Sequence, residues 1–235
     1  MACDADRAVW PHGACRDASG ASIAFVVGAG LAACEMQGDA SVWAVRPACG
    51  EAHAGTHAVA CEGAAPSGPL VFVWWPMRLP FVERIVDPAP GTCEVALEAE
   101  PDGPWEPLRG IDELCADVEP SCAAPVVIDL VVRDGDPCAG SEFVERCRAE
   151  LVDGRIVLRA ESAPARIVTC SPAFGDRVAR CALPPLAIGG YEVVDDHGRV
   201  LGAITIGAEG RGGRACTEVP TDEVDGSPRT HRLGE

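Results

Sequence analysis

Two cysteines and two histidines recur at intervals of four residues in the segment CGEAHAGTHAVAC, as Cys49, His53, His57 and Cys61. Thiolate and imidazole groups are ligands that Zn²⁺ and Cu²⁺ prefer. In one extended strand the four side chains would share a face but spread over roughly 40 Å, too far to meet at one ion. A turn between His53 and His57 would bring the two imidazoles together and create a metal site. Disulfide bonding of the two cysteines, which leaves the histidines in or beside a strand, is the favoured interpretation.

The apolar stretch SIAFVVGAGLAAC allows three interpretations. As a dinucleotide fingerprint it would place Gly28, Gly30 and Ala33 in the glycine positions and Glu51 at the ribose, but the sequence that follows is too short for the required crossover helix. As the core of an export leader it would end in a lipid-accepting Cys34, but leaders begin short and basic, whereas the preceding residues carry more acids than bases. We therefore favour an ordinary buried strand.

The chain has 13 cysteines among 235 residues, and none of them forms a Cys-x-x-Cys motif. Thioredoxin-type redox motifs and ribbon-type zinc sites are thereby disfavoured. Cysteines scattered through both halves indicate a disulfide framework formed in an oxidising compartment. Cys170 and Cys181, which flank a short excursion of the chain, are a candidate pair. The odd total leaves one sulfur over, and we expect Cys3 to be the lipid-accepting residue, with Cys34 as the alternative.

Two acidic clusters are better explained by turns than by chemistry. The segment DGDPCAGSE has oxygen donors for Ca²⁺ but lacks the further ligands of an EF-hand loop. The segment DDHG places acids beside a histidine, yet such residues are favoured in a reversal for backbone reasons. The residues concerned are Asp134, Asp136 and Glu142 in the first cluster, and Asp195, Asp196 and His197 in the second.

The composition excludes several classes of function. With 36 acidic and 19 basic residues the net charge is -17, which repels nucleic acids and anionic membrane surfaces. Every basic residue is an arginine, so Schiff-base, pyridoxal and phosphate-loop mechanisms that need a lysine are excluded. The signatures of nucleophile-elbow hydrolases and of common zinc proteases are also missing. We expect no cofactor, and no apolar span approaches membrane length.

Short apolar runs bounded by Gly, Pro or Asp predict strands throughout the chain. A short helix is predicted only over residues 110–116. The hairpin GYEVVDDHGRVLGAITI is expected to reverse at its DDHG turn. The other predicted strands cover residues 22–27, 41–46, 55–61, 69–75, 92–98, 125–133, 142–150, 154–160, 165–170 and 177–182.

The segment CADVEPSCAAP, with its Pro, Cys and acids, divides the chain into halves of similar size. We therefore predict an all-β protein with an N-terminal β-sandwich over residues 1–118 and a C-terminal β-sandwich over residues 119–218. The polar, Pro- and Gly-rich residues 219–235 are expected to form a mobile tail.

Two adjacent tryptophans end the run VFVWW, as Trp74 and Trp75. Successive side chains of a strand face opposite sides, so both can enter a core only if the strand is covered on both faces. One of them is therefore a candidate contact for a partner or a sugar. The favoured interpretation is a tryptophan covered by a neighbouring domain or loop.

The segments CALPPLAIGGYEVVDDHGRVLGAITI and GTHAVAC resemble strands of immunoglobulin-like modules in Cys-rich, exported bacterial lipoproteins. The resemblance implies two disulfide-stabilised immunoglobulin-like domains in tandem, located in the periplasm or at the cell surface, and assigns no catalytic residue. We expect a non-catalytic binding or structural module for a protein or carbohydrate partner. The alternatives are an extracytoplasmic Zn- or Cu-binding protein and an enzyme with its site on loops between the domains.

Overall fold

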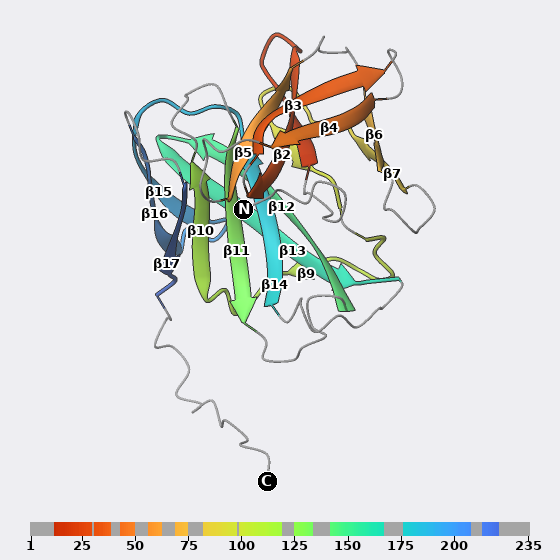
Figure 1. Ribbon diagram of the computed structural model, residues 1–235. Helices are drawn as coiled ribbons and strands as arrows, with labels where there is room; N and C mark the ends of the chain where they lie inside the picture. The colour runs from red at the N-terminus through yellow and green to blue at the C-terminus, as the bar shows by residue number, and fades with distance from the viewer. Residues whose placement is uncertain are drawn as a thin grey trace.

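The computed structural model of the protein describes residues 12–29, 31–38, 43–49, 56–62, 69–74, 82–97, 99–118, 125–133, 142–166, 176–207 and 213–220. The elements of this part of the chain are strands, which form three sheets (Figure 1). The prediction of an all-β protein is therefore confirmed.

The N-terminal sheet contains eight strands in the order β7-β6-β4-β3-β5-β2-β1-β8. Most neighbours are antiparallel, but β3 pairs with β5 and β4 pairs with β6 in parallel. Its strands are β1 (His12–Arg16), β2 (Ser22–Ala29), β3 (Leu31–Gly38), β4 (Trp43–Cys49), β5 (Thr56–Glu62), β6 (Leu70–Trp74), β7 (Val82–Val86) and β8 (Cys93–Val95).

The rest of the described chain forms a central sheet and a C-terminal sheet. The central sheet has the antiparallel order β14-β11-β10-β17, from β10 (Glu113–Val118), β11 (Val126–Arg133), β14 (Asp176–Leu183) and β17 (Gly213–Glu218). The C-terminal sheet has the order β12-β13-β15-β16, and β9 pairs with β13 beside it. Its strands are β9 (Glu106–Pro107), β12 (Phe143–Val152), β13 (Arg155–Pro164), β15 (Gly189–Asp195) and β16 (Val200–Ile206).

One large apolar cluster lies between the central and C-terminal sheets. Alternate residues of β10, β11 and β14 supply one side, including Leu114, Ile128 and Leu183, and β13 supplies Ile156 and Leu158 on the other. All five side chains are almost completely buried. Because successive residues of a strand face opposite sides, this alternation fixes which face of the central sheet points to the C-terminal sheet.

The opposite face of the central sheet lies against the N-terminal sheet. Val127 and Ala182 of the central sheet pack with Phe25, Cys15 and Cys93 in a separate buried cluster. In agreement, β8 lies beside β14, and β5 lies beside β10, β11 and β17. The strand β11 is therefore buried on both faces, as its nearly continuous apolar run indicates.

Gly13 lets the N-terminal sheet accommodate its largest described core side chain. A Cβ atom at this position would lie 2.7 Å from Cζ of the Phe25 ring and would also meet the carbonyl oxygen of Glu94. Phe25 is fully buried one strand away, in direct register with Gly13. The missing side chain of Gly13 is thus the space that the ring occupies.

Apart from the strand 165–170, the strand predictions are confirmed where the structure describes the residues concerned, with shifts of a few residues at the ends. The predicted helix over 110–116 is wrong, because β10 begins at Glu113 and pairs with a strand on each side. Of the predicted strand 165–170, Ala165 makes an isolated bridge to Pro101, and residues 167–170 lie outside the described part.

The sheets do not divide at the predicted boundary after residue 118. Strands β9 and β10 precede this position, yet they pair with β13, β11 and β17, which follow it. The strand pairing of the C-terminal half therefore begins by Glu106. The assignment of two immunoglobulin-like sandwiches stays a prediction, and residues 221–235 of the predicted tail lie outside the described part.

Candidate functional site

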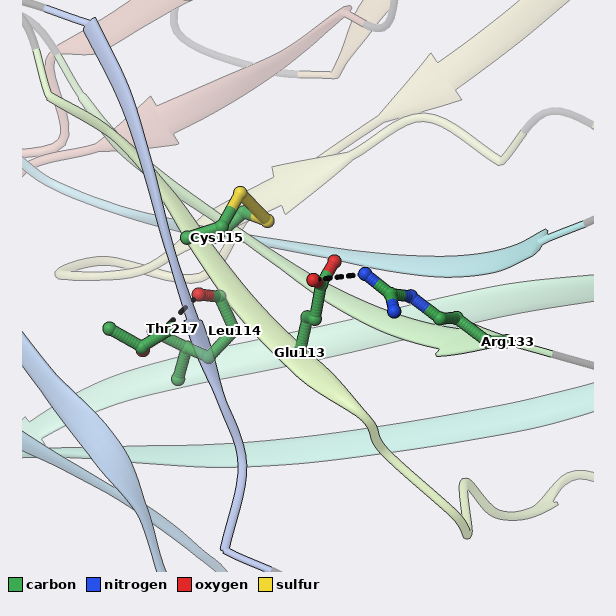
Figure 2. The surroundings of a disulfide bond; sticks show 6 residues. Glu113, Leu114, Cys115, Arg133 and Thr217 are labelled. Atoms are coloured by element: carbon green, nitrogen blue, oxygen red, sulfur yellow. Dashed lines mark hydrogen bonds and ion pairs between the residues drawn. A yellow bond between two sulfur atoms is a disulfide. The ribbon is translucent and has the colours of Figure 1, made fainter.

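A disulfide between Cys115 and Cys216 joins the two last strands at one side of the central sheet. Cys115 lies in β10 and Cys216 in β17, and the two residues stand directly opposite each other in the antiparallel register. Figure 2 shows Cys115 and its disulfide between the neighbouring strands. The bond closes a chain separation of 101 residues, so it ties the beginning of the C-terminal half to its end.

The two sulfur-bearing residues differ in their access to solvent. Cys115 is 2% exposed, whereas Cys216 is exposed, as are its neighbours Ala215, Thr217 and Glu218. Within the described part of the chain, β17 pairs with β10 alone and forms the edge of the sheet. Of the two residues that form this disulfide, Cys216 is therefore the one that is open to solvent.

Among the described residues, a side-chain hydrogen bond joins β17 to β10 in addition to the backbone ladder. The Thr217 hydroxyl donates a hydrogen bond to the Leu114 carbonyl at 3.5 Å, and Figure 2 shows this contact and the nearby ion pair between Glu113 and Arg133. Beyond the strand, the backbone N–H of Val219 donates to the carbonyl of Asp112 at 2.9 Å. Val219 is buried and anchors the residues that follow β17.

A polar row crosses the central sheet from this disulfide. In register, Cys115 is followed by Asp129 of β11 and Arg180 of β14. Asp129 is 1% exposed, and Arg180 donates from Nε to its Oδ1 at 2.9 Å. A buried carboxylate is tolerated when it is paired and hydrogen-bonded. The guanidinium of Arg180 therefore compensates the negative charge of a carboxylate that lies between two layers of the molecule.

A second polar cluster lies between the central and C-terminal sheets. Arg177 donates from Nε to Glu145 Oε1 at 2.9 Å, and it also donates to the Ser162 hydroxyl. That hydroxyl lies 3.3 Å from the same Glu145 oxygen, and the guanidinium stacks 4.2 Å from the centroid of the Phe143 ring. Among the described contacts of this serine there is no imidazole, which is the usual general base of a serine nucleophile. The geometry of the cluster is that of a structural ion pair.

A third cluster faces outward from the C-terminal sheet. The Arg146 guanidinium lies 4.2 Å from the centroid of the Trp105 ring and donates from Nε to Glu161 at 2.7 Å. Trp105 is half-buried, and the side chains of Arg146 and Glu161 are partly exposed. A half-buried tryptophan held by an arginine offers a rigid contact surface with a hydrogen-bonding rim.

The sequence-predicted metal and binding residues fall mostly outside the described part of the chain. His53 and Trp75 lie there, as does the predicted lipidation residue Cys3. His57 lies in β5 opposite Gly28, and Trp74 ends β6, with only the backbone described. The described residues contain no group of three or more potential metal ligands. The metal site, the tryptophan contact and the lipid anchor stay predictions.

The stretch that suggested a nucleotide loop or a leader forms strands. Residues 22–29 make β2, which pairs with β1 and β5, so the favoured interpretation as a strand is confirmed. The dinucleotide interpretation is wrong, because β2 is followed by the strand β3 instead of a helix. Cys34 lies within β3, opposite Cys61, and Cys61 is disulfide-bonded.

The predicted pairing of Cys170 with Cys181 is wrong, because Cys181 bonds to Cys147. Both partners lie in the large core cluster, where β12 and β14 approach each other. The alternation of FVERCRAELV and DRVARCAL places each cysteine on the same side as its apolar neighbours Ala149 and Ala179. This alternation in the two segments could have indicated the Cys147–Cys181 pair, whereas closeness in the sequence was misleading.

The turn interpretation of the DDHG segment is confirmed. The Asp195 carboxylate accepts hydrogen bonds from the backbone N–H groups of His197 and Arg199, both at 2.9 Å. Gly198 adopts a φ of 83°, which a glycine allows at no steric cost. Of the other acidic segment, only Glu142 is described, and its carbonyl accepts from the N–H of Ala165.

The sequence predicted neither the polar row that starts at Cys115 nor the cluster around Arg177, since both depend on strands far apart in the chain. Among the described residues, no helix is long and apolar enough to cross a membrane. Comparison of the chain with protein-family models, curated proteins and solved structures finds no match. The assignment of function therefore depends on the geometry of the protein itself.

Proposed function

We propose that the protein is an exported, non-catalytic binding or structural module of a bacterial periplasm or cell surface, with Cys3 as its lipid-accepting residue. Three disulfides join strands within the described residues, which indicates an oxidising, extracytoplasmic environment. The excess of acidic residues speaks against a nucleic-acid partner.

The observation that supports a non-catalytic function is that the buried carboxylates are paired with arginines. Glu145 and Asp129 are the described buried carboxylates in ion pairs, and each is bonded to an arginine of β14. An acid or base needs a reactive atom that can meet a substrate within hydrogen-bond reach. Both carboxylates instead bridge strands inside the molecule, which supports a structural role for them.

We assign the partner contact to the surface formed by Trp105, Arg146 and Glu161. Tryptophan and arginine are the side chains that most often dominate interfaces, and a partly exposed indole ring also suits the face of a sugar. The surface fits a protein or a carbohydrate partner. Trp74 and Trp75 form the alternative contact.

The exported location is tested by the intact mass of the protein, isolated from an oxidising compartment and alkylated before and after reduction. We expect no more than one or two of the 13 cysteines to be free before reduction. Alkylation of most cysteines without prior reduction would contradict the proposal.

The contact surface is tested by co-sedimentation with insoluble cell-wall polysaccharide and by binding to immobilised envelope proteins. Trp105→Ala is expected to weaken binding, whereas Ile85→Ala, at an exposed residue of the N-terminal sheet, is the matched control. Loss of binding in Trp74→Ala or Trp75→Ala alone would move the contact to the alternative site. Equal binding by all variants would exclude both surfaces.

A further inference from the structure

We propose that the Cys115–Cys216 disulfide is a thiol-exchange site of the folded protein, and that its reduction frees the edge strand β17. This goes beyond the proposed function, which assigns no reaction to any cysteine. The inference begins from two disulfides with the same placement. Cys15 and Cys93 stand opposite each other on β1 and β8, as Cys115 and Cys216 do on β10 and β17.

Access to solvent distinguishes the described disulfides. Thiol exchange requires a thiolate to reach one of the two sulfur atoms. Cys15 and Cys93 are 2% and 6% exposed, and the core pair Cys147 and Cys181 are 8% and 0% exposed. Among these three disulfides only the Cys115–Cys216 bond has an exposed residue, Cys216. The attacking thiolate therefore meets the Cys216 sulfur.

The position of β17 makes this bond separable from the rest of the fold. The strand lies at the sheet edge, and its residues 215–218 are exposed, so these residues themselves bury little apolar surface. Segments with few buried apolar contacts open at the lowest free energies. By contrast, Cys147–Cys181 lies inside the large core cluster, and Cys15 and Cys93 belong to the cluster around Phe25.

The reaction is a two-step exchange with a dithiol, such as a protein with two neighbouring cysteines or dithiothreitol. The thiolate of the dithiol attacks the Cys216 sulfur, a mixed disulfide forms there, and the Cys115 sulfur leaves and takes up a proton. The second thiol of the reagent then displaces Cys216 and closes its own disulfide. Two electrons pass from the dithiol to the protein, which ends with two thiols.

After reduction β17 is held by its backbone ladder and by the contacts of Thr217 and Val219. Backbone hydrogen bonds of an edge strand are open to water on one side. We therefore expect the amides of residues 213–218, and those of β10 that pair with them, to exchange with solvent faster in the reduced protein.

The site is tested on the full-length oxidised protein under native conditions. Timed exposure to dithiothreitol is stopped with acid, and the thiols are then alkylated in denaturant, so that burial no longer limits the labelling. Peptide masses give the fraction reduced for each pair. We expect Cys115 and Cys216 to be reduced at least about tenfold faster than the other two described pairs.

Glutathione identifies the attacked sulfur, because a monothiol leaves a mixed disulfide. The glutathione mass is expected on Cys216, and the alkyl group on Cys115. Hydrogen exchange of β17 is then compared in the oxidised protein, the reduced protein and the Cys115→Ser/Cys216→Ser variant. Both proteins that lack the bond should show faster exchange in β17, with β13 unchanged.

Three results would overturn the proposal. The first is reduction of Cys15–Cys93 or Cys147–Cys181 as fast as, or faster than, Cys115–Cys216. The second is glutathione on Cys115 instead of Cys216. The third is unchanged hydrogen exchange in β17 after reduction of the wild-type protein. The kinetic test needs no substitution, so a variant that fails to fold does not leave the proposal open.

Discussion

The two faces of the central sheet are covered by different means. On the face toward the C-terminal sheet, branched apolar side chains such as Ile128 and Leu130 join a cluster of twenty buried residues within the described chain. On the face toward the N-terminal sheet, Val127 belongs to a described cluster of five buried residues. The Asp129–Arg180 pair and the Cys115–Cys216 disulfide also lie in the central sheet.

This difference indicates how the layers are stabilised. Apolar burial contributes in proportion to the area removed from water, so among the described residues the large cluster makes the greater non-covalent contribution. In the described part of the chain, the face toward the N-terminal sheet has a smaller apolar cluster and the buried Asp129–Arg180 pair, which fixes the partner of a charged group. Adjacent residues of β11 on opposite faces allow this comparison to be tested directly.

The largest effect is expected from Ile128→Ala, which removes a fully buried side chain from the large cluster. We expect a loss of about 2–5 kcal/mol in the free energy of unfolding, because tightly packed neighbours cannot fill the cavity. A change from Val to Ala at position 128, given by comparing Ile128→Val with Ile128→Ala, removes the same atoms as Val127→Ala. Urea unfolding should give the larger loss at Ile128, by about 1 kcal/mol. Equal losses would mean that both interfaces are equally rigid.

A smaller effect is expected when the ion pairs on the two sides of β12 are compared. Arg177→Met removes the partner of Glu145, whose side chain is 7% exposed, and should cost about 2–3 kcal/mol after allowance for the partial exposure of Arg177. Arg146→Met breaks the more exposed pair with Glu161 and should cost less than about 1 kcal/mol. Chemical unfolding measures both. A greater loss at Arg146 would contradict the assignment of Glu145 to the interior.

The smallest effect is expected at the exposed turn between β1 and β2. The hydroxyl of Ser19, and then the backbone N–H of Ala21, donate to the Asp17 carboxylate and hold its pKa below the usual value. Since the pKa is lowered in the folded state, the stabilisation is present above the unfolded pKa and is lost as the pH falls through the folded value.

Asp17→Asn should therefore reduce the stability slightly at neutral pH and leave it unchanged in acid below the folded pKa. Thermal unfolding between neutral and acidic pH measures this difference, with Asp102→Asn at another exposed site as the control. A difference between Asp17→Asn and the wild type that grows toward acid would contradict the direction of the pKa change.

The sequence predicted the strands far better than their partners. The run PVVIDLVVR predicts β11 because its apolar residues are mostly β-branched and nearly continuous, and its burial on both faces follows from the same feature. The parallel pairing of β13 with β15 could not be predicted, because it depends on contacts that neither strand encodes alone. The segment of β10 was mistaken for a helix, since pairing on both sides outweighs its local preference.

The sequence predicted that the candidate site would contain disulfides, but not which residues would form it. The number of cysteines correctly indicated disulfides, yet the sequence gives no connectivity, and Cys181 was assigned to the wrong partner. Asp129 was read only as part of a strand, although a single acid within an apolar run is a signal of a buried ion pair. Its partner Arg180 lies far along the chain and becomes evident only through the β11–β14 register.

The two cross-strand disulfides also determine how the protein responds to mechanical tension. Cys15–Cys93 and Cys115–Cys216 span 78 and 101 residues, and the two closed segments follow each other along the chain. A pulling force applied outside these segments passes through the sulfur bridges and leaves the enclosed residues unloaded. Between Cys15 and Cys216, only the short connection from Cys93 to Cys115 can be drawn out. While both bridges are intact, most of the strands described here are therefore shielded from extension.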